Sequence, residues 1–179
     1  MESVARHPRP PELRDASLED IAKRYTKRFI DTDPDWNAYA DASIEGFKRA
    51  RHGYIGKGVS GRDFDPNIIP PRNLSFAVMF VNPGQGNAAH THETEEIFFV
   101  LQGRLSVFLE DESGQRLWVR LNQWDCVACP PGVIHGYHNE SHEPVYIMIM
   151  LGKGQPEFMG YADQNLYENR GSHLETPSS

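Results

Sequence analysis

Short runs of β-forming residues, separated by turn residues, fill the second half of the sequence. The runs cover residues 74–81, 95–102, 104–110, 115–121, 125–129, 135–139 and 144–151, and glycine, proline, asparagine or serine marks most of the turns between them. The intervals leave no room for helices. This spacing therefore predicts an all-β domain, residues 74–153, built as an antiparallel barrel or sandwich.

The last of these runs, PVYIMIML at residues 144–151, is apolar on both faces. Successive side chains of a strand point to opposite faces, so one face fills the interior while the other needs a cover. The N-terminal segments or a second subunit would supply that cover, and we expect a homodimer.

The first 52 residues carry helical patterns instead. Ser17 and Asp20 resemble a capping box, and apolar residues then recur every four positions at Ile21, Tyr25 and Phe29. A helix is therefore expected to begin after Ser17.

A second, shorter helical pattern has Ile44 and Phe47 on one side and ends near Gly53. A stretch rich in prolines and glycines follows it. Because apolar stripes on short helices need something to pack against, residues 1–73 are expected to form a helical and loop extension on or beside the barrel.

The C-terminal extension, residues 154–179, is rich in loops and ends in the polar segment GSHLETPSS, which we expect to be frayed. It is long enough to fold over a barrel mouth as a lid or to reach a second subunit as a dimer arm, and the sequence favours neither. Arg170 in this extension and Arg72 before the barrel are each able to bind a substrate carboxylate, although the sequence places neither near a site.

Charge and composition exclude some classes of binding partner for this protein. The 179 residues include 18 basic and 25 acidic side chains, and the formal net charge of -7 repels phosphate backbones and anionic lipids, which argues against nucleic acid and membrane partners. No apolar run approaches the roughly 20 residues of a membrane-spanning helix, and the N-terminus lacks the apolar region of a signal peptide. With only two cysteines, too few for a disulfide framework, the sequence predicts a cytoplasmic protein.

Candidate chemistry begins in the segment GNAAHTHETEEIFFVLQG, residues 86–103. Residues two apart on a strand share a face, so His90 and His92 point to the same side. Glu96 has the same parity and reaches them if the chain bends in between. Downstream, His135 follows a Pro-Gly turn whose fixed backbone aims the ring.

Imidazoles combined with a carboxylate suit ferrous iron, manganese, nickel, copper or zinc. Four protein ligands leave open positions on an octahedral ion, and open positions allow chemistry.

Neighbouring residues compete for these roles. Glu95 lies next to Glu96 but has the opposite parity, and His138 faces away from His135 for the same reason. Asn139 is expected to tie its strand to the following loop. The remaining histidines are expected to be ordinary core or surface residues: His7, His52, His142 and His173.

Three further residues are candidates for the pocket around such a site. Gln102 and Tyr137 share the parity of the nearby ligands. Cys129 faces the interior, where it is expected to act as a small apolar side chain. Cys126 lies three positions before it on the same strand and faces the opposite side, which argues against a zinc site made by the two cysteines.

These spacings resemble a known family. The first cupin motif is matched position by position by Gly84, His90-Thr91-His92, Glu96 and Gly103, and most of the second motif by Pro130-Pro131-Gly132, His135 and Asn139. One position departs from the pattern, because the glycine that opens the second motif is Trp124 here. That glycine lies at a turn, so we expect a changed loop shape and an intact metal site.

The resemblance implies a jelly-roll β-barrel over about residues 74–152. It also implies that four side chains of this chain, His90, His92, Glu96 and His135, together bind one divalent metal, with ferrous iron favoured and manganese, nickel, zinc or copper possible.

The activities of the family supply the functional hypotheses. Cupins of this size include dioxygenases of small diketones, phenols, thiols and hydroxyketones, so a non-haem iron dioxygenase is the first hypothesis. A metal-dependent isomerase, lyase or decarboxylase is the second, and a barrel that binds a small ligand without turning it over is the third. The N-terminal helices have no basic recognition face, which argues against a DNA-binding sensor.

Overall fold

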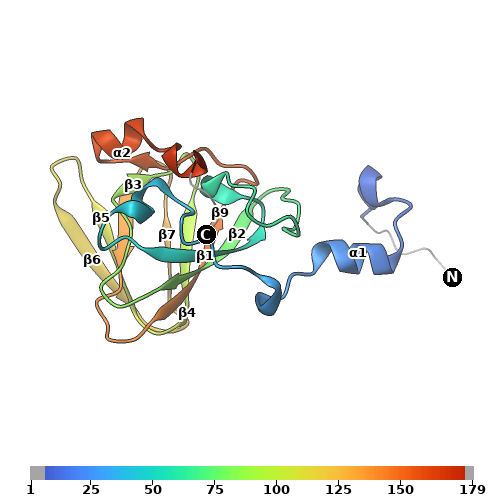
Figure 1. Cartoon of the computed structure of the whole chain (residues 1–179), viewed down its shortest axis with the longest axis horizontal. Coiled ribbons are helices and arrows are strands. Elements are labelled where there is room, and N and C mark those ends of the chain that lie inside the picture. Colours follow the sequence, from blue (N-terminus) through green and yellow to red (C-terminus); the bar gives the residue numbers. More distant parts are fainter. Residues whose placement is uncertain (1–6, 176–179) are drawn as a thin grey trace.

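A computed structural model describes residues 7–175, and in this part of the chain ten strands form two five-stranded antiparallel sheets (Figure 1). One sheet has the spatial order β1 (Arg49–Ile55), β2 (Ser75–Val81), β9 (Val145–Leu151), β4 (Glu96–Gln102) and β7 (Cys126–Cys129). The other has the order β10 (Gly160–Tyr161), β3 (His90–Thr91), β8 (Ile134–His138), β5 (Leu105–Glu110) and β6 (Arg116–Leu121). The predicted all-β jelly roll is confirmed.

Each of the seven β-forming runs becomes a strand whose ends lie within one residue of the predicted ones. The strand β9 shows why this pattern is reliable. Val145, Ile147, Ile149 and Leu151 are buried against the interior, while the residues between them are half-buried on the outer face. Burial of alternate apolar side chains from both sheets supplies the main stabilisation of the barrel.

The outer face of β9 is partly covered by the N-terminal segment. The ring of Phe29 meets Tyr146 edge to face at 5.9 Å and lies 4.8 Å from the ring of His52. Phe29 itself remains 48% exposed. A second subunit is a further source of cover, and the homodimer stays a prediction.

The first predicted helix is present as α1 (Leu18–Tyr25), and the Ser17 side chain accepts a hydrogen bond from the N–H of Asp20 as expected of a cap. None of its residues is buried, and Figure 1 shows α1 extending away from the barrel. The second predicted helix is wrong. A 3-10 turn, Ala40–Ser43, and the strand β1 take its place, because the free edge of β2 offers backbone partners along its whole length.

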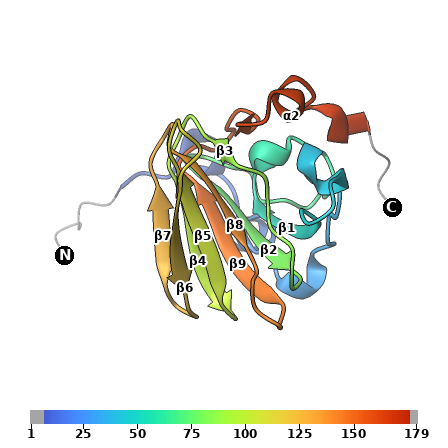
Figure 2. The same ribbon diagram turned by 90° about the vertical axis from the view of Figure 1, so that its left-hand side faces the viewer.

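The C-terminal extension lies across one end of the barrel. Figure 2 shows α2 (Gln164–Glu168) above the short strand β3, with the long strands running side by side below. The described part of the tail reaches Glu175, and within it His173 is buried with its Nε2 2.7 Å from the carbonyl oxygen of Ser60, while the fraying of the end stays a prediction. The last four residues of the predicted frayed tail, 176–179, and residues 1–6 of the N-terminal extension lie outside the described residues. Within residues 7–175 no helix has the length and apolar character needed to span a bilayer.

In the turn before β7, Trp124 has a left-handed backbone conformation, which is usually adopted by glycine. Trp124 has a φ of 75° and is the only non-glycine residue with a positive φ in the described part of the chain. Its N–H donates a hydrogen bond of 2.9 Å to the carbonyl oxygen of Val100, which holds the backbone in the left-handed conformation. A residue with a Cβ is strained in this conformation, so Trp124 carries a backbone cost that a glycine would avoid, and the changed loop shape stays a prediction.

Candidate metal centre

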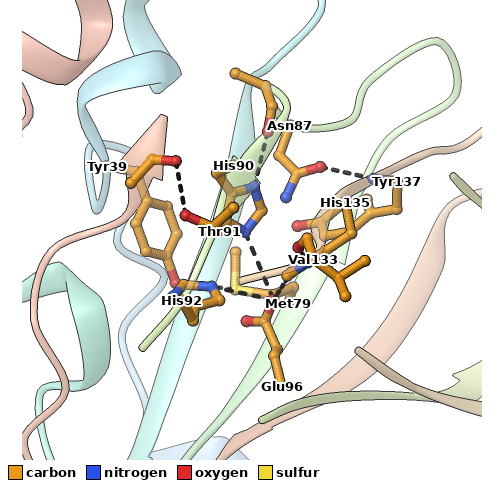
Figure 3. A network of polar contacts seen from close by, with 12 residues as sticks. Tyr39, Met79, Asn87, His90, Thr91, His92, Glu96, Val133, His135 and Tyr137 are labelled. Atoms are coloured by element: carbon orange, nitrogen blue, oxygen red, sulfur yellow. Dashed lines mark hydrogen bonds and ion pairs between the residues drawn. The ribbon is translucent and has the colours of Figure 1, made fainter. Parts of the chain in front are cut away.

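Three short pieces of β-structure bring four ligand side chains to one point. His90 lies on β3 opposite His135 of β8, His92 follows directly after β3, and Glu96 begins β4. All four are buried, and their ligand atoms lie within 4.8 Å of one another. Figure 3 shows the three rings turned toward the carboxylate of Glu96. The structure thus assembles the set that the sequence singled out, and this cluster could hold a metal ion.

One oxygen of the carboxylate is the meeting point. The Nε2 atoms of His135, His92 and His90 lie 2.9, 3.2 and 3.5 Å from Oε2 of Glu96. The rings of His90 and His135 are also close, with centroids 4.6 Å apart. Three imidazole nitrogens around one carboxylate oxygen form a compact set of nitrogen and oxygen donors of the kind that transition metals prefer.

Backbone carbonyl groups determine which ring nitrogen of His90 and of His135 is left to bind a metal. Nδ1 of His90 lies 2.8 Å from the carbonyl oxygen of Ala88, and Nδ1 of His135 lies 2.8 Å from that of Val133. A carbonyl oxygen only accepts, so each Nδ1 carries a hydrogen and each Nε2 presents its lone pair to Glu96 when the ring is neutral. Lone pairs that face a carboxylate repel one another unless a proton or a cation lies between them. The donor set therefore fits a divalent metal.

Burial and mutual contact set the charges of the cluster. Burial lowers the pKa of His90 to about 4, and the neighbouring His135 and His92 add to this effect. Burial alone would raise the carboxyl pKa of Glu96, but His92 and the hydrogen bonds from the imidazoles hold it well below its usual range. Burial alone would lower the pKa of His135, but its hydrogen bond with Glu96, the negative charge of that carboxylate and its hydrogen bond with the Val133 carbonyl together raise it. The carboxylate therefore stays ionised, as metal binding requires.

The barrel interior around the four ligands, which we call the metal chamber, is mostly apolar. Phe98 lies 5.8 Å from the ring of His135, and the strand register places Cys129 opposite Glu96. Cys129 is fully buried, and burial raises its thiol pKa to about 12. It therefore acts as a small apolar side chain and not as a nucleophile, as the sequence suggested.

Of the other two pocket candidates, Tyr137 lies in the interior of the barrel and Gln102 does not. Tyr137 is buried, its ring meets Phe98 edge to face at 5.3 Å, and its hydroxyl has no hydrogen-bond partner among residues 7–175. Gln102 is exposed at the far end of β4 and does not reach the site. The register of β4 against β9 shifts between Val100 and Gln102, so the alternation that predicted an inward Gln102 breaks at that point.

The competing residues lie away from the cluster. Glu95 is exposed, and Nε2 of His138 lies 3.1 Å from the carbonyl oxygen of Gly84. The Asn139 amide donates to the carbonyl oxygens of Val81 and Glu143, which ties β8 to the following loop.

A cleft of about 690 Å³ lies between β3 and the C-terminal extension, and one of its walls is His92. Arg170 and Tyr167 line it from the extension, with the guanidinium 4.2 Å from the centre of the Tyr167 ring. Arg170 thus lines the same cleft as His92, whereas Arg72 pairs with Glu12 on the exposed side of the N-terminal segment. The sequence could not decide between the two arginines, because their positions depend on how the extensions fold back.

Sequence reasoning missed the residues that the N-terminal extension adds to the chamber. The Tyr39 hydroxyl lies 3.7 Å from the sulfur of Met79, and Figure 3 shows Tyr39 beside His92. Arg49 and Arg51 of β1 are buried as well. Their alternate spacing was a usable signal, but only if residues 49–55 had been recognised as a strand.

Known proteins match the same region. The family model described as "Cupin domain" matches residues 77–151. The germin-like protein 9-2 of Oryza sativa subsp. japonica is 27% identical over 86 residues, which cover 48% of this chain and 40% of that protein. The chain therefore spans about two-fifths of the length of this curated relative.

Two solved oxalate decarboxylases have a similar fold. The enzyme of Lactobacillus farciminis, in a formate complex, gives a TM-score of 0.59 at 17% identity and covers 89% of this chain and 42% of that one. A deletion mutant of the Bacillus subtilis enzyme gives a TM-score of 0.53 at 18% identity and covers 78% of this chain and 32% of that one. At these identities the likeness concerns the fold alone.

Proposed function

Since the barrel of this chain belongs to the cupin superfamily, we propose that the protein is a metal-dependent enzyme, and specifically a non-haem iron dioxygenase of a small organic substrate. The observation that carries the proposal is the buried set of His90, His92, Glu96 and His135, whose ligand atoms converge within 4.8 Å. A barrel that only bound a ligand would have no need for these three imidazoles around one carboxylate.

When bound by His90, His92, Glu96 and His135, a ferrous ion would supply redox chemistry for the reaction of a substrate with dioxygen. The chain's own residues prepare that arrangement. The carbonyl oxygens of Ala88 and Val133 orient His90 and His135, and Glu96 contributes one negative charge. Phe98 and the other apolar side chains of the metal chamber exclude water from the site.

An oxygen-independent reaction at the same centre is the second candidate. Two proteins that share the fold are oxalate decarboxylases, so decarboxylation is included among the reactions to be tested. An isomerase or lyase would use the same four ligands. These reactions differ from the first in one measurable respect, the consumption of oxygen.

The test begins with the metal. Protein purified without chelators is analysed for its metal content, then reconstituted with ferrous iron under anaerobic conditions and screened for oxygen uptake with diketones, phenols, hydroxyketones and small carboxylic acids. Stoichiometric iron and substrate-dependent oxygen uptake are the expected results. His92→Ala is expected to lose both, while His138→Ala, a matched change outside the cluster, keeps both.

Two results would count against the proposal. A protein that binds no transition ion would remove the metal enzyme altogether. A protein that binds manganese or zinc, consumes no oxygen and releases carbon dioxide from a carboxylic acid would instead select the second candidate.

A further inference from the structure

The strand β1 places two arginines on the inner side of the barrel. In the register of β1 against β2, Arg49 lies opposite Val81 and Arg51 lies opposite Met79. Val81 and Met79 are fully buried members of the core, so both arginines have the parity of the interior. Arg49 is 2% exposed and Arg51 is 6% exposed.

The buried positive charge of Arg49 is balanced by nearby groups. Its Nη2 lies 3.0 Å from Oδ1 of the buried Asp41, and its Nη1 donates to the carbonyl oxygen of Phe47 at 2.9 Å. Its guanidinium also lies 4.5 Å from the centre of the Tyr39 ring. A buried charge with an ion-pair partner, a hydrogen bond and an aromatic face is the usual structural arrangement.

The buried positive charge of Arg51 is not balanced by a carboxylate of the described residues. Its side chain makes one hydrogen bond, from Nη2 to the carbonyl oxygen of Gly56 at 3.0 Å. Among residues 7–175 no carboxylate lies within ion-pair distance of its guanidinium. A guanidinium has five N–H donors, and burying its charge without an anion is costly. Such an arrangement is typical of a site whose anion arrives with the ligand.

The guanidinium lies at the end of the barrel that holds the metal ligands. The side chain of Arg51 passes over Gly53, where an added Cβ would lie 2.7 Å from Nη1, and both Nη2 and the hydroxyl of Ser75 lie beside Gly58. Ser75 pairs with Leu151 across β2 and β9, and Leu151 pairs with Glu96 across β9 and β4. Arg51 therefore reaches the same row of the sheet as Glu96.

Tyr39 connects the two groups. Its hydroxyl donates only to the sulfur of Met79, a weak acceptor, at 3.7 Å. Burial raises the phenol pKa, Arg51 is the neighbouring charge that lowers it most, and Glu96 raises it, so the hydroxyl is within electrostatic range of both. In Figure 3 the ring of Tyr39 stands beside His92 and Met79 at the edge of the cluster. A weakly bonded donor thus lies beside the cluster, and its acceptor, Met79, is the residue that Arg51 pairs with across β1 and β2.

We propose that Arg51 binds the carboxylate of the substrate, with the Tyr39 hydroxyl as a second donor, and that the substrate is a small organic acid. The inference rests on the proposed function for its metal but adds the class of molecule. A guanidinium matches a carboxylate with two parallel hydrogen bonds.

The first experiment needs no metal. Thermal unfolding of the metal-free protein is measured at constant ionic strength with pyruvate and benzoate, each against its neutral amide, pyruvamide and benzamide. At least one acid is expected to raise the Tm more than its amide does. Arg51→Met is expected to abolish that difference and to weaken carboxylate binding by roughly 10- to 100-fold, as the loss of charged hydrogen bonds implies.

The sign of the stability change separates a binding role from a structural one. Because Arg51→Met removes a buried charge without a partner, it is expected to raise the Tm of the ligand-free protein. Arg49→Met, the matched control two residues away, leaves Asp41 unpaired and is expected to lower it. If Arg51→Met and Arg51→Gln both lower the Tm or fail to fold, Arg51 is structural and the inference is overturned.

The two proposals fail in different ways. Elemental analysis of Arg51→Met is expected to show the same metal content as the unaltered protein. If the unaltered protein binds metal but neither acid stabilises it more than its amide, the inference falls and the metal enzyme stands. If it binds acids through Arg51 but takes up no metal, the proposed function falls and the anion site stands.

Discussion

The barrel segment, residues 77–151, and the N-terminal extension up to residue 73 both line the metal chamber, but they contribute different chemistry. The barrel segment supplies all four candidate ligands, and the three imidazoles converge on the carboxylate of the fourth, Glu96. The extension supplies a phenol, Tyr39, and two buried arginines, Arg49 and Arg51. The part that would bind a metal therefore lies in the segment that matches the cupin model, whereas the part that would recognise a substrate is added from outside it.

The two regions are also connected through a hydrogen-bond chain. Oδ2 of Asp41 accepts from the N–H of Ala88 at 3.0 Å, and the carbonyl oxygen of Ala88 lies 2.8 Å from Nδ1 of His90. Asp41 in turn pairs with Arg49. The extension thus positions one of the four candidate ligands, His90, and also supplies the side chains that we propose for substrate binding.

The largest expected effect comes from breaking this connection. Arg49→Met leaves the carboxylate of Asp41 buried without its partner and is expected to destabilise the protein by about 3–5 kcal/mol. Urea denaturation measures the change. The double variant Asp41→Asn/Arg49→Met removes the unpaired charge and is expected to regain part of the loss. Equal stability of Arg49→Met and the unaltered protein would show that the extension contributes little to the fold.

The next largest effect concerns the barrel segment alone. His92→Ala removes one of four ligands and is expected to weaken metal binding by about 3 kcal/mol, roughly 100-fold, taken as a quarter of the binding energy of a four-ligand site. Competition with a chelator measures the affinity. Glu95→Ala, next to the cluster but exposed, is the control and is expected to bind as the unaltered protein does. A normal affinity in His92→Ala would mean that the metal lies elsewhere.

The same division explains what the sequence could predict. The seven strands of the barrel alternate apolar side chains between turns, and this local pattern is strong enough to place their ends within one residue. His90, His92 and Glu96 share a parity on adjoining strands, so their convergence follows from local geometry. Asn139 and Cys129 could be interpreted in the same way, from their place on a strand.

The extension could not be predicted in this way, because its conformation is decided by distant partners. Residues 49–55 show no apolar alternation, because arginine or glycine occupies positions 49, 51 and 53. They form a strand only because the free edge of β2 pairs with them. The same holds at Gln102, where a register shift against β9 overrides the alternation. Local patterns therefore predicted the metal site, and non-local pairing decided which side chains join it.

A smaller effect tests the one departure of the barrel segment from its motif. Trp124 has a φ of 75°, which costs a residue with a Cβ about 1–2 kcal/mol, and β-branched residues suffer most. Trp124→Val is therefore expected to lower the stability by about 1–2 kcal/mol, while Trp124→Gly stays within about 1 kcal/mol of the unaltered protein because glycine relieves the strain as the Phe99 contact is lost. Thermal unfolding compares the two, and metal content is expected to stay unchanged in both. Equal stability of the two variants would show that the turn relaxes to another shape.

The smallest expected effect on stability is that of Tyr39→Phe. It contrasts with Arg49→Met, which is expected to destabilise the protein strongly. Tyr39→Phe keeps the ring that Arg49 packs against and removes only a hydroxyl whose partner is the sulfur of Met79, so the free energy of unfolding is expected to change by less than about 1 kcal/mol. Carboxylate affinity, measured by calorimetry, is expected to fall several-fold, since one donor beside the cluster is lost. A variant that loses stability and keeps its affinity would make Tyr39 a packing residue. The extension would then supply only the charge of Arg51 to the substrate side of the chamber, and the phenol would belong with Arg49 to the framework that supports His90.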